Sequence, residues 1–379
     1  MSRFFDLVSK PAREMAGHMP KQPPRPVADS GPKVIRLDSN ENPFGPSPRA
    51  VQAMRLALAE SHDYPDNDCS ALRNRLAAQH SIPPEQILVT AGSTGMLSLL
   101  CQTLLAPGLN AVTSERSFIV YGMLVHASGA QLIETPLQND GFDLDAILDA
   151  INEETRIVFL ANPNNPTGTL VDAAALDKFL AEVPGHVVVV LDEAYFQFAE
   201  HFAAHRNVEY SRSFEHLKCG ACVVVLRTFS KVHGLAGLRI GYGAGPAELM
   251  AYCARMRNTF SVASVAHAAA LAALDDQAHI ARTLANNADQ AQVLGVGLSE
   301  MGYRVVPTWA NFLYCDIGED VAGFSERLRG EGISVRPLGA WGAPTCVRVT
   351  IGTAEQNRLL LGAIPRIAGT KIGAPPDNR

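Results

Sequence analysis

Short apolar runs alternate with longer helical patterns through the first two thirds of the chain. The plainest run, Val187–Leu191, is apolar without interruption, which is typical of a strand buried on both faces of a parallel sheet. Strands that alternate with helices form a βαβ pattern and predict an α/β fold with a mostly parallel sheet flanked by helices. We expect strands at Ile87–Thr90, Leu132–Thr135, Ile157–Ala161, Val187–Leu191, Cys222–Leu226 and Leu238–Tyr242, and helices at Thr94–Leu105, Leu144–Ile151 and Ala173–Glu182.

The pattern changes after about Pro246. A long helical stretch leads to shorter strands and helices, which is typical of a smaller α+β domain. Met1–Ser30 contains five prolines and predicts an extended arm, either mobile or packed on a partner subunit. We therefore expect an arm at 1–35, a large domain at 36–245, a small C-terminal domain at 246–369 and a disordered tail at 370–379. The later elements are expected at Asp276–Met301, Tyr303–Val306, Phe312–Asp316, Val321–Gly330, Ser334–Pro337, Val347–Ile351 and Ala354–Ile367.

Charge and composition narrow the class of protein. The chain has 379 residues, of which 32 are basic and 38 acidic, and this balance lacks the basic footprint of a nucleic-acid-binding protein. No apolar run approaches the roughly 20 residues that span a bilayer, and the start of the chain lacks the apolar stretch of a signal peptide. We therefore expect neither a nucleic acid nor a membrane as partner.

The seven cysteines are scattered and odd in number, so no disulfide framework is indicated. This usage favours a reducing, cytoplasmic location. Cys219 and Cys222 form a CxxC pair, but a structural zinc site needs a second pair, which the sequence lacks. We interpret the pair as a loop cysteine followed by a strand cysteine and expect no metal site.

Polar clusters directly follow four of the predicted strands. In open α/β sheets, ligands bind at the carboxyl ends of the strands, so these clusters predict one shared site. The glycines at 241, 243 and 245 imitate a dinucleotide-binding loop, but they come late in the sheet and lack the full G-x-G-x-x-G pattern, which excludes that class. The clusters are Gly92–Gly95, Asn162–Gly168, Asp192–Tyr195 and Arg227–Lys231.

Two of these clusters contain residues suited to a phosphate. Ser93 and Thr94 stand where a strand gives way to a helix, and they either bind a phosphate or only cap the helix. Thr228 and Ser230 flank Lys231, and Arg239 follows eight residues later. These residues predict a phosphate site around an amine that can form an imine.

Asp192 ends the most apolar strand, where an unpaired carboxylate would be costly. A protonated pyridine nitrogen is one cation that would offset this cost, and Tyr195 could then bond a phenolate oxygen of the same ring. The alternative is an ordinary aspartate that caps a helix.

Taken together, these residues resemble those of the histidinol-phosphate aminotransferases, a family within the fold-type-I enzymes that depend on pyridoxal 5′-phosphate (PLP). The resemblance covers nearly the whole chain, and its motifs keep their order and spacing. The matching segments are Leu37–Pro48, Tyr64–Asp66, Asn162–Gly168, Asp192–Tyr195, Arg227–Tyr242, Asn311–Phe312 and Val347–Thr353.

The resemblance implies a role for each matched residue. Lys231 would form the Schiff base with PLP, and the reaction would pass through a quinonoid, with Asp192 and Tyr195 as further catalytic residues. Tyr64 would reach the cofactor of the partner subunit, which implies a homodimer. The implied cofactor-binding residues are Ser93, Thr94, Phe118, Asn165, Asp192, Tyr195, Thr228, Ser230, Lys231, Arg239 and Tyr64, and the implied substrate-binding residues are Asn40, Arg336 and Arg348.

The implied activity transfers an amino group from histidinol phosphate to 2-oxoglutarate. An arginine fork suits a phosphate or a carboxylate equally, so Arg348 could bind both substrates in turn. His233, two residues after the lysine, is a further candidate for a general base.

The chain departs from the family pattern at three places. Arg13–Pro26 lacks the usual tyrosine, Gly95-Met96 replaces acidic residues, and Arg257–Phe260 lacks a proline. These departures keep open an aminotransferase for aromatic or other amino acids, and a PLP decarboxylase or oxidase. A non-catalytic regulator of the same fold is disfavoured, because Lys231 is intact.

Overall fold

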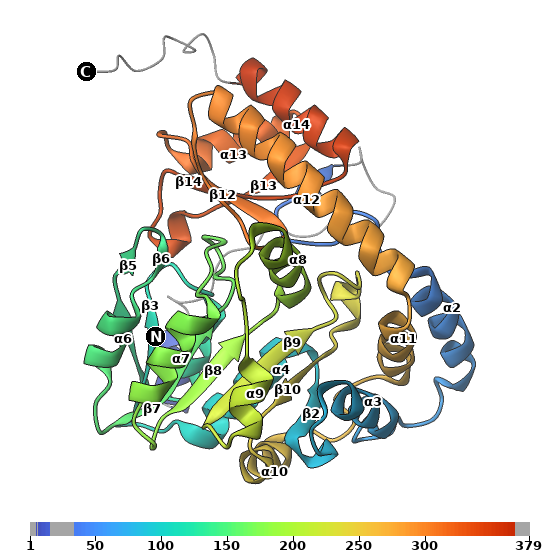
Figure 1. The fold of residues 1–379 in the computed structure, drawn as a ribbon, viewed down its shortest axis with the longest axis vertical. Coiled ribbons are helices and arrows are strands. Elements are labelled where there is room, and N and C mark those ends of the chain that lie inside the picture. The colour runs from blue at the N-terminus through green and yellow to red at the C-terminus, as the bar shows by residue number, and fades with distance from the viewer. Residues whose placement is uncertain (1–4, 6, 16–33, 368–379) are drawn as a thin grey trace.

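The computed structural model describes residues 5, 7–15 and 34–367 (Figure 1). The expected tail at 370–379 and most of the expected arm lie outside these residues. Within the arm, α1 (Lys10–Glu14) is helical, whereas we expected an extended segment. Pro11 explains the difference, because a proline in the first turn of a helix has no amide hydrogen to leave unpaired.

Seven strands form the larger sheet, in the order β2-β10-β9-β8-β7-β3-β4. All are parallel except β10, which is antiparallel to both of its neighbours. The prediction of an α/β fold with a mostly parallel sheet is therefore confirmed. The strands are β2 (Ile87–Thr90), β3 (Asn110–Ser114), β4 (Gln131–Thr135), β7 (Thr155–Ala161), β8 (Val188–Asp192), β9 (Val223–Thr228) and β10 (Gly241–Ala244).

Helices cover both faces of this sheet, and each face has its own apolar core. Successive strand residues alternate between the two cores, as Leu88 and Val89 do in β2. One face packs against α3 (Ser70–His80), α7 (Ala173–Glu182), α9 (Ser213–Lys218) and α11 (Ser264–Leu274), with α2 (Pro48–Ala57) alongside α11. The other packs against α4 (Gly92–Leu104), α5 (Val120–Ala127) and α10 (Ala247–Met256).

One predicted strand begins too early, and one strand of the larger sheet was not predicted. Leu238 ends a 3-10 helix, Arg239 has the left-handed φ of 53°, and the strand begins only at Gly241. Gly241 is required there, because a Cβ would stand 2.7 Å from the backbone nitrogen of Ser93. We also missed β3, whose polar sequence hides its burial: all five residues are buried, and Thr113 Oγ1 donates to the carbonyl of Phe159 at 2.9 Å.

The second sheet has five strands in the order β1-β13-β14-β12-β11. It packs against α12 (Gln277–Glu300), α13 (Val321–Gly330) and α14 (Ala354–Ile367) around a third apolar core. In Figure 1, α12 extends from this sheet toward α2 and α11. The strands are β1 (Ile35–Leu37), β11 (Arg304–Val306), β12 (Phe312–Asp316), β13 (Ile333–Pro337) and β14 (Cys346–Thr350).

The packing of two segments cuts across the predicted domain boundaries. β1 pairs in parallel with β13, so residues 35–37 belong to the second sheet. α10 and α11 pack with α4 and α2, beside the larger sheet, although they follow residue 245. The division at 35/36, 245/246 and 369/370 stays a prediction. In the described part of the chain, no helix is long and apolar enough to cross a membrane.

Candidate active site

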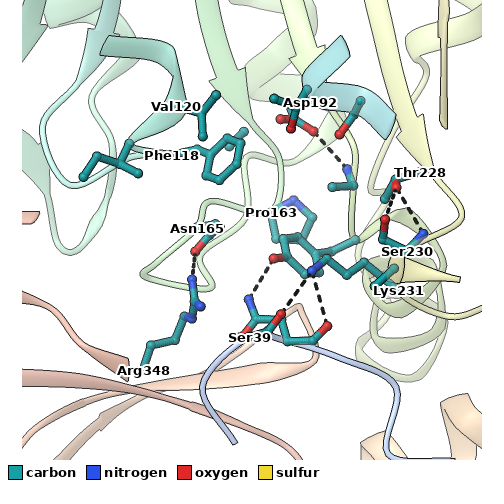
Figure 2. Close-up of a pocket in the computed structure, with 18 of the residues that line it drawn as sticks. Ser39, Phe118, Val120, Pro163, Asn165, Asp192, Thr228, Ser230, Lys231 and Arg348 are labelled. Atoms are coloured by element: carbon teal, nitrogen blue, oxygen red, sulfur yellow. Dashed lines mark hydrogen bonds between the residues drawn. The ribbon is translucent and has the colours of Figure 1, made fainter. Parts of the chain in front are cut away.

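A cavity of about 430 Å³ lies where the carboxyl ends of β7, β8 and β9 meet the second sheet (Figure 2). The segment after β1 closes it, and β13 and β14 each contribute an arginine. Residues from all four polar clusters line this cavity, as we expected. The sequence-predicted residues that line the cavity are Asn40, Ser93, Thr94, Phe118, Asn165, Asp192, Tyr195, Thr228, Ser230, Lys231, Arg239, Arg336 and Arg348.

Lys231 follows β9, and its amine points into the cavity (Figure 2). Nζ donates to the carbonyl oxygen of Asn40 at 3.3 Å and lies 5.5 Å from the ring centroid of Tyr195. Burial, followed by the positive charges of Arg348 and Arg239, lowers the pKa of Lys231 to about 7. A large fraction of this amine is therefore neutral near pH 7, and the neutral amine is the nucleophilic form.

Asp192 is the last residue of β8 and is 5% exposed. Oδ2 accepts from the hydroxyl of Tyr121 at 3.0 Å, and Oδ1 accepts from the backbone N–H of Ala194 at 3.3 Å. Burial raises the pKa of Asp192 to about 6, against the effect of both hydrogen bonds. Asp192 has no ion-pair partner among the described residues, so its carboxylate is available to a cationic ligand. It does not cap the helix that follows, α8 (Phe196–Arg206), so that alternative is wrong.

Donors for an anion gather where α4 begins. α4 starts at Gly92 without a side-chain cap, so Ser93 and Thr94 lie inside its first turn and the capping alternative is wrong. Ser230 Oγ accepts from Thr228 Oγ1 at 2.9 Å and from Arg239 Nη1 at 3.5 Å. A Cβ on Gly92 would stand 2.5 Å from Arg239 Nη2, so a larger residue here would push the guanidinium out of this position. Helix-terminal N–H groups, hydroxyls and a guanidinium are the donors that hold a phosphate.

Two arginines from the second sheet stand at the opposite side. Arg348 and Arg336 are directly paired across β14 and β13, and both donate to the carbonyl oxygen of Asp38, at 3.0 and 3.1 Å. Arg348 Nη1 also donates to Asn165 Oδ1 at 2.5 Å, while its buried Nε has no partner among the described residues (Figure 2). Asn40 Nδ2 donates to the Tyr195 hydroxyl at 2.8 Å. This end of the cavity is suited to an anionic substrate group.

Two singled-out residues lie outside the cavity lining. Tyr64 is 83% exposed and stacks on Phe260 with ring centroids 4.7 Å apart. His233 is buried beside Phe229, and burial lowers its pKa to about 4. Because His233 does not face the cavity, its position does not support a role as general base there.

Sequence reasoning missed several lining residues. Ser39 and Glu41 flank Asn40 and were within reach, because the matched segment contains them. The apolar residues at the start of α5, and Trp341 from the second domain region, have no sequence motif around them that would indicate a binding site. The missed residues include Ser39, Glu41, Ile119, Val120, Met123, Pro163 and Trp341, together with Tyr121, which contacts Asp192 from outside the lining.

A buried lysine, a buried carboxylate and an anion cradle at the carboxyl edge of this sheet are the groups that a PLP-dependent enzyme of fold type I requires. The chain belongs to the family described as aminotransferase class I and II, whose model matches residues 32–364.

Individual proteins within this family show more specific similarities to the chain. The chain is 40% identical to histidinol-phosphate aminotransferase 2 of Pseudomonas fluorescens over 96% of this chain and 98% of the relative. It is also 40% identical to the histidinol-phosphate aminotransferase of an Anaeromyxobacter species, over 89% and 91%. Among solved structures, histidinol-phosphate aminotransferase from Sinorhizobium meliloti in complex with pyridoxal-5′-phosphate is similar, with a TM-score of 0.83 and 29% identity over 97% and 98% of the two chains.

Proposed function

We propose that this chain binds PLP and catalyses the reversible transfer of an amino group from histidinol phosphate to 2-oxoglutarate, giving imidazole acetol phosphate and glutamate. The observation that carries the proposal is the position of Arg348, buried in the same cavity as Lys231 and Asp192. The names of the relatives support histidinol phosphate as the amino donor.

The residues of the cavity fit PLP. The first turn of α4, Thr228, Ser230 and Arg239 would hold its phosphate, and the room left by Gly92 suits that arrangement. Lys231 would hold the cofactor through Nζ, and Asp192 would pair with its ring nitrogen. Asn165 and Tyr195 would bond its ring oxygen, and Phe118 would stack on its ring. When bound, PLP supplies an electron sink for the charge left at the substrate carbon that loses its proton.

The protein then contributes proton transfer and charge. Once displaced by the substrate amine, Lys231 would take the proton from the substrate Cα, and its lowered pKa suits both steps of that transfer near pH 7. Asp192 would keep the ring nitrogen protonated, because an adjacent carboxylate favours the cation. Asn40 would orient the Tyr195 hydroxyl, because Nδ2 donates to it.

Arg348 would bind the phosphate of one substrate and a carboxylate of the other, in alternating half-reactions. Its fork geometry matches both anions, and burial strengthens the contact. Asn165 and the carbonyl of Asp38 hold two of its nitrogens, so the guanidinium is oriented before substrate arrives. Arg336 adds a second positive charge beside it.

The enzyme is proposed to act as a cytoplasmic homodimer. Tyr64 is exposed on its own chain and lies outside its own cavity, as a residue that serves a partner would. Its hydroxyl would reach the cofactor phosphate of the second subunit.

A second candidate donor is an aromatic amino acid. The wall formed by Ile119, Val120, Met123 and Trp341 is largely apolar and would accept a flat aromatic side chain. Decarboxylation and oxidation have no comparable observation in their favour.

Single-turnover spectroscopy of the PLP form tests the proposal. The purified enzyme is mixed in turn with histidinol phosphate, phenylalanine and glutamate, and conversion to the pyridoxamine form is followed. We expect fast conversion with histidinol phosphate and glutamate. Fast conversion with phenylalanine and slow conversion with histidinol phosphate would overturn the donor, and no conversion with any amine would overturn the aminotransferase activity.

A further inference from the structure

Tyr121 is buried next to the candidate active site, and its hydroxyl contacts Asp192. It stands in the first turn of α5 and is 1% exposed. Its ring stacks on Phe159 of β7 with centroids 4.6 Å apart, and the ring of Phe118 meets it edge-on at 5.5 Å. Two aromatic neighbours thus fix the ring, and its hydroxyl donates to Asp192 Oδ2 at 3.0 Å.

This hydrogen bond affects the protonation of Asp192, on which several neighbouring groups act in opposite directions. Burial and, more weakly, the charge of the neighbouring Glu193 raise the pKa of Asp192, whereas Lys231 lowers it, and all contributions together bring it to about 6. The phenol of Tyr195 also lies near Asp192, but it is uncharged at neutral pH because burial raises its pKa. The Tyr121 hydroxyl and the Ala194 N–H are the two donors that favour the ionised carboxylate.

Tyr121 is suited to be a permanent donor. Burial and the negative charge of Asp192 raise the pKa of Tyr121 well above its usual value, so the phenol keeps its proton. The ring cannot turn away, because Phe159 and Phe118 confine it. A hydrogen bond to a charged group is also stronger than one between neutral groups.

We propose that Tyr121 is a positioning residue whose hydroxyl keeps Asp192 ionised and oriented, so that the carboxylate can pair with the ring nitrogen of the bound cofactor. This inference rests on the proposed function and adds to it a residue from α5 that touches neither cofactor nor substrate. Without the hydroxyl, Asp192 would more readily take up a proton and lose its attraction for the ring cation.

The first test is Tyr121→Phe in the PLP-loaded enzyme, because this change removes the hydroxyl and keeps the stacked ring. We expect kcat to fall roughly tenfold to a hundredfold, the worth of a hydrogen bond to a charged group, while KM for the amino donor changes little. Tyr242→Phe is the matched control, since Tyr242 is also buried in the large sheet but its hydroxyl contacts His80, at 2.9 Å. An unchanged kcat in Tyr121→Phe would overturn the proposal.

A second test uses the apo-protein and needs no activity. The pKa of Asp192 in the fold lies above its unfolded value of about 3.9, so the folded state binds more protons and stability falls as pH rises between the two values. Tyr121→Phe raises the pKa of Asp192 in the folded state further. The melting temperature of this variant should therefore continue to fall up to a higher pH than that of the parent or of Tyr242→Phe. A uniform drop at every pH would mean that Tyr121 only packs.

A third test separates charge from packing in the holoenzyme. PLP with a methyl group on its ring nitrogen carries a fixed positive charge, which no longer depends on Asp192. We expect Tyr121→Phe to lose much less kcat, relative to the parent, with this analogue than with PLP. Equal losses with both cofactors would refute the positioning role. If the parent takes up neither cofactor, the proposed function fails, and the melting experiment still tests the link between Tyr121 and Asp192.

Discussion

The amine of Lys231 owes its chemistry to the groups packed around it. Burial and two arginines disfavour its charged form, whereas Glu41 and Asp192 favour it, and the balance brings the pKa to about 7. A lysine in water would be almost fully protonated at that pH. The same residue can therefore attack a carbonyl carbon and later carry a proton, which a surface lysine could not do efficiently.

Replacing Lys231 by alanine removes both abilities. We expect Lys231→Ala to lose the visible absorbance of covalently held PLP and to lose at least roughly 10²–10⁴-fold in rate, the contribution of a positioned proton-transfer group. Absorbance spectra and steady-state assays measure the two effects. Lys178→Ala, on the exposed face of α7, is the matched control and should behave as the parent. A Lys231→Ala protein that retained both properties would rule out the PLP assignment.

The pKa of Lys231 can be read from the pH dependence of PLP uptake by the apo-protein. Since the neutral amine reacts, the rate should rise with pH through about 7. Arg348→Met removes a positive charge that lowers this pKa, so the curve should move to higher pH. Arg336→Met is the control, because Arg336 is not among the leading charges that shift the pKa of Lys231. A curve centred near the usual lysine value of about 10.4 would contradict the prediction.

The strands β8 and β9 both end at the cavity, and a buried ion pair joins the residues next to Asp192 and Thr228. Arg227 Nη2 and Nε contact Glu193 Oε2 at 2.8 and 3.1 Å, and Ser211 donates to the same carboxylate at 2.6 Å. Arg227 also lies over the ring of Phe196, 3.3 Å from its centroid. Glu193 follows Asp192, and Arg227 precedes Thr228, so the pair holds the two strand ends in register.

Breaking this ion pair should lower the free energy of unfolding. Arg227→Met leaves Glu193 charged and buried, and we expect a loss of about 3–5 kcal/mol in the free energy of unfolding. Arg227→Met combined with Glu193→Gln should lose less, because no unpaired charge remains. Urea denaturation measures both, with Arg358→Met at the exposed pair with Glu355 as a control that changes little. Equal losses in the single and double variants would show that charge pairing is not the cause.

The whole molecule places two sheets around one cavity, and the proposed dimer adds a second chain. The larger sheet supplies Lys231 and Asp192, and the second sheet supplies Arg336 and Arg348. A site built from both sheets depends on how they pack. Tyr64, exposed and outside this cavity, is the residue through which the proposed second subunit would take part.

Mixed dimers test whether Tyr64 acts on the partner. Lys231→Ala and Tyr64→Ala subunits, refolded together, would form one site with both changes and one intact site. We therefore expect the mixture to regain activity and tight PLP binding that neither variant has alone. If Tyr64 served its own chain, every site would keep one defect and the mixture would not recover. Size-exclusion chromatography of each variant checks that dimers form.

The sequence by itself determined the features that depend on local order. The uninterrupted apolar run predicted β8, and Asp192 at its end, because burial on both faces leaves a continuous pattern. The motifs around Lys231 and Asn165 identified the class of site, since each lies directly after a strand. Such signals need only neighbours along the chain.

Only the tertiary structure decided the rest. β3 is buried although it is polar, because its side chains bond across to β7 and beyond, which no local pattern records. Tyr121 meets Asp192 across 71 positions of sequence, and Arg348 meets Asn165 across 183. Contacts of this kind arise from how the sheets pack, and the charge state of Asp192 and the orientation of Arg348 depend on them.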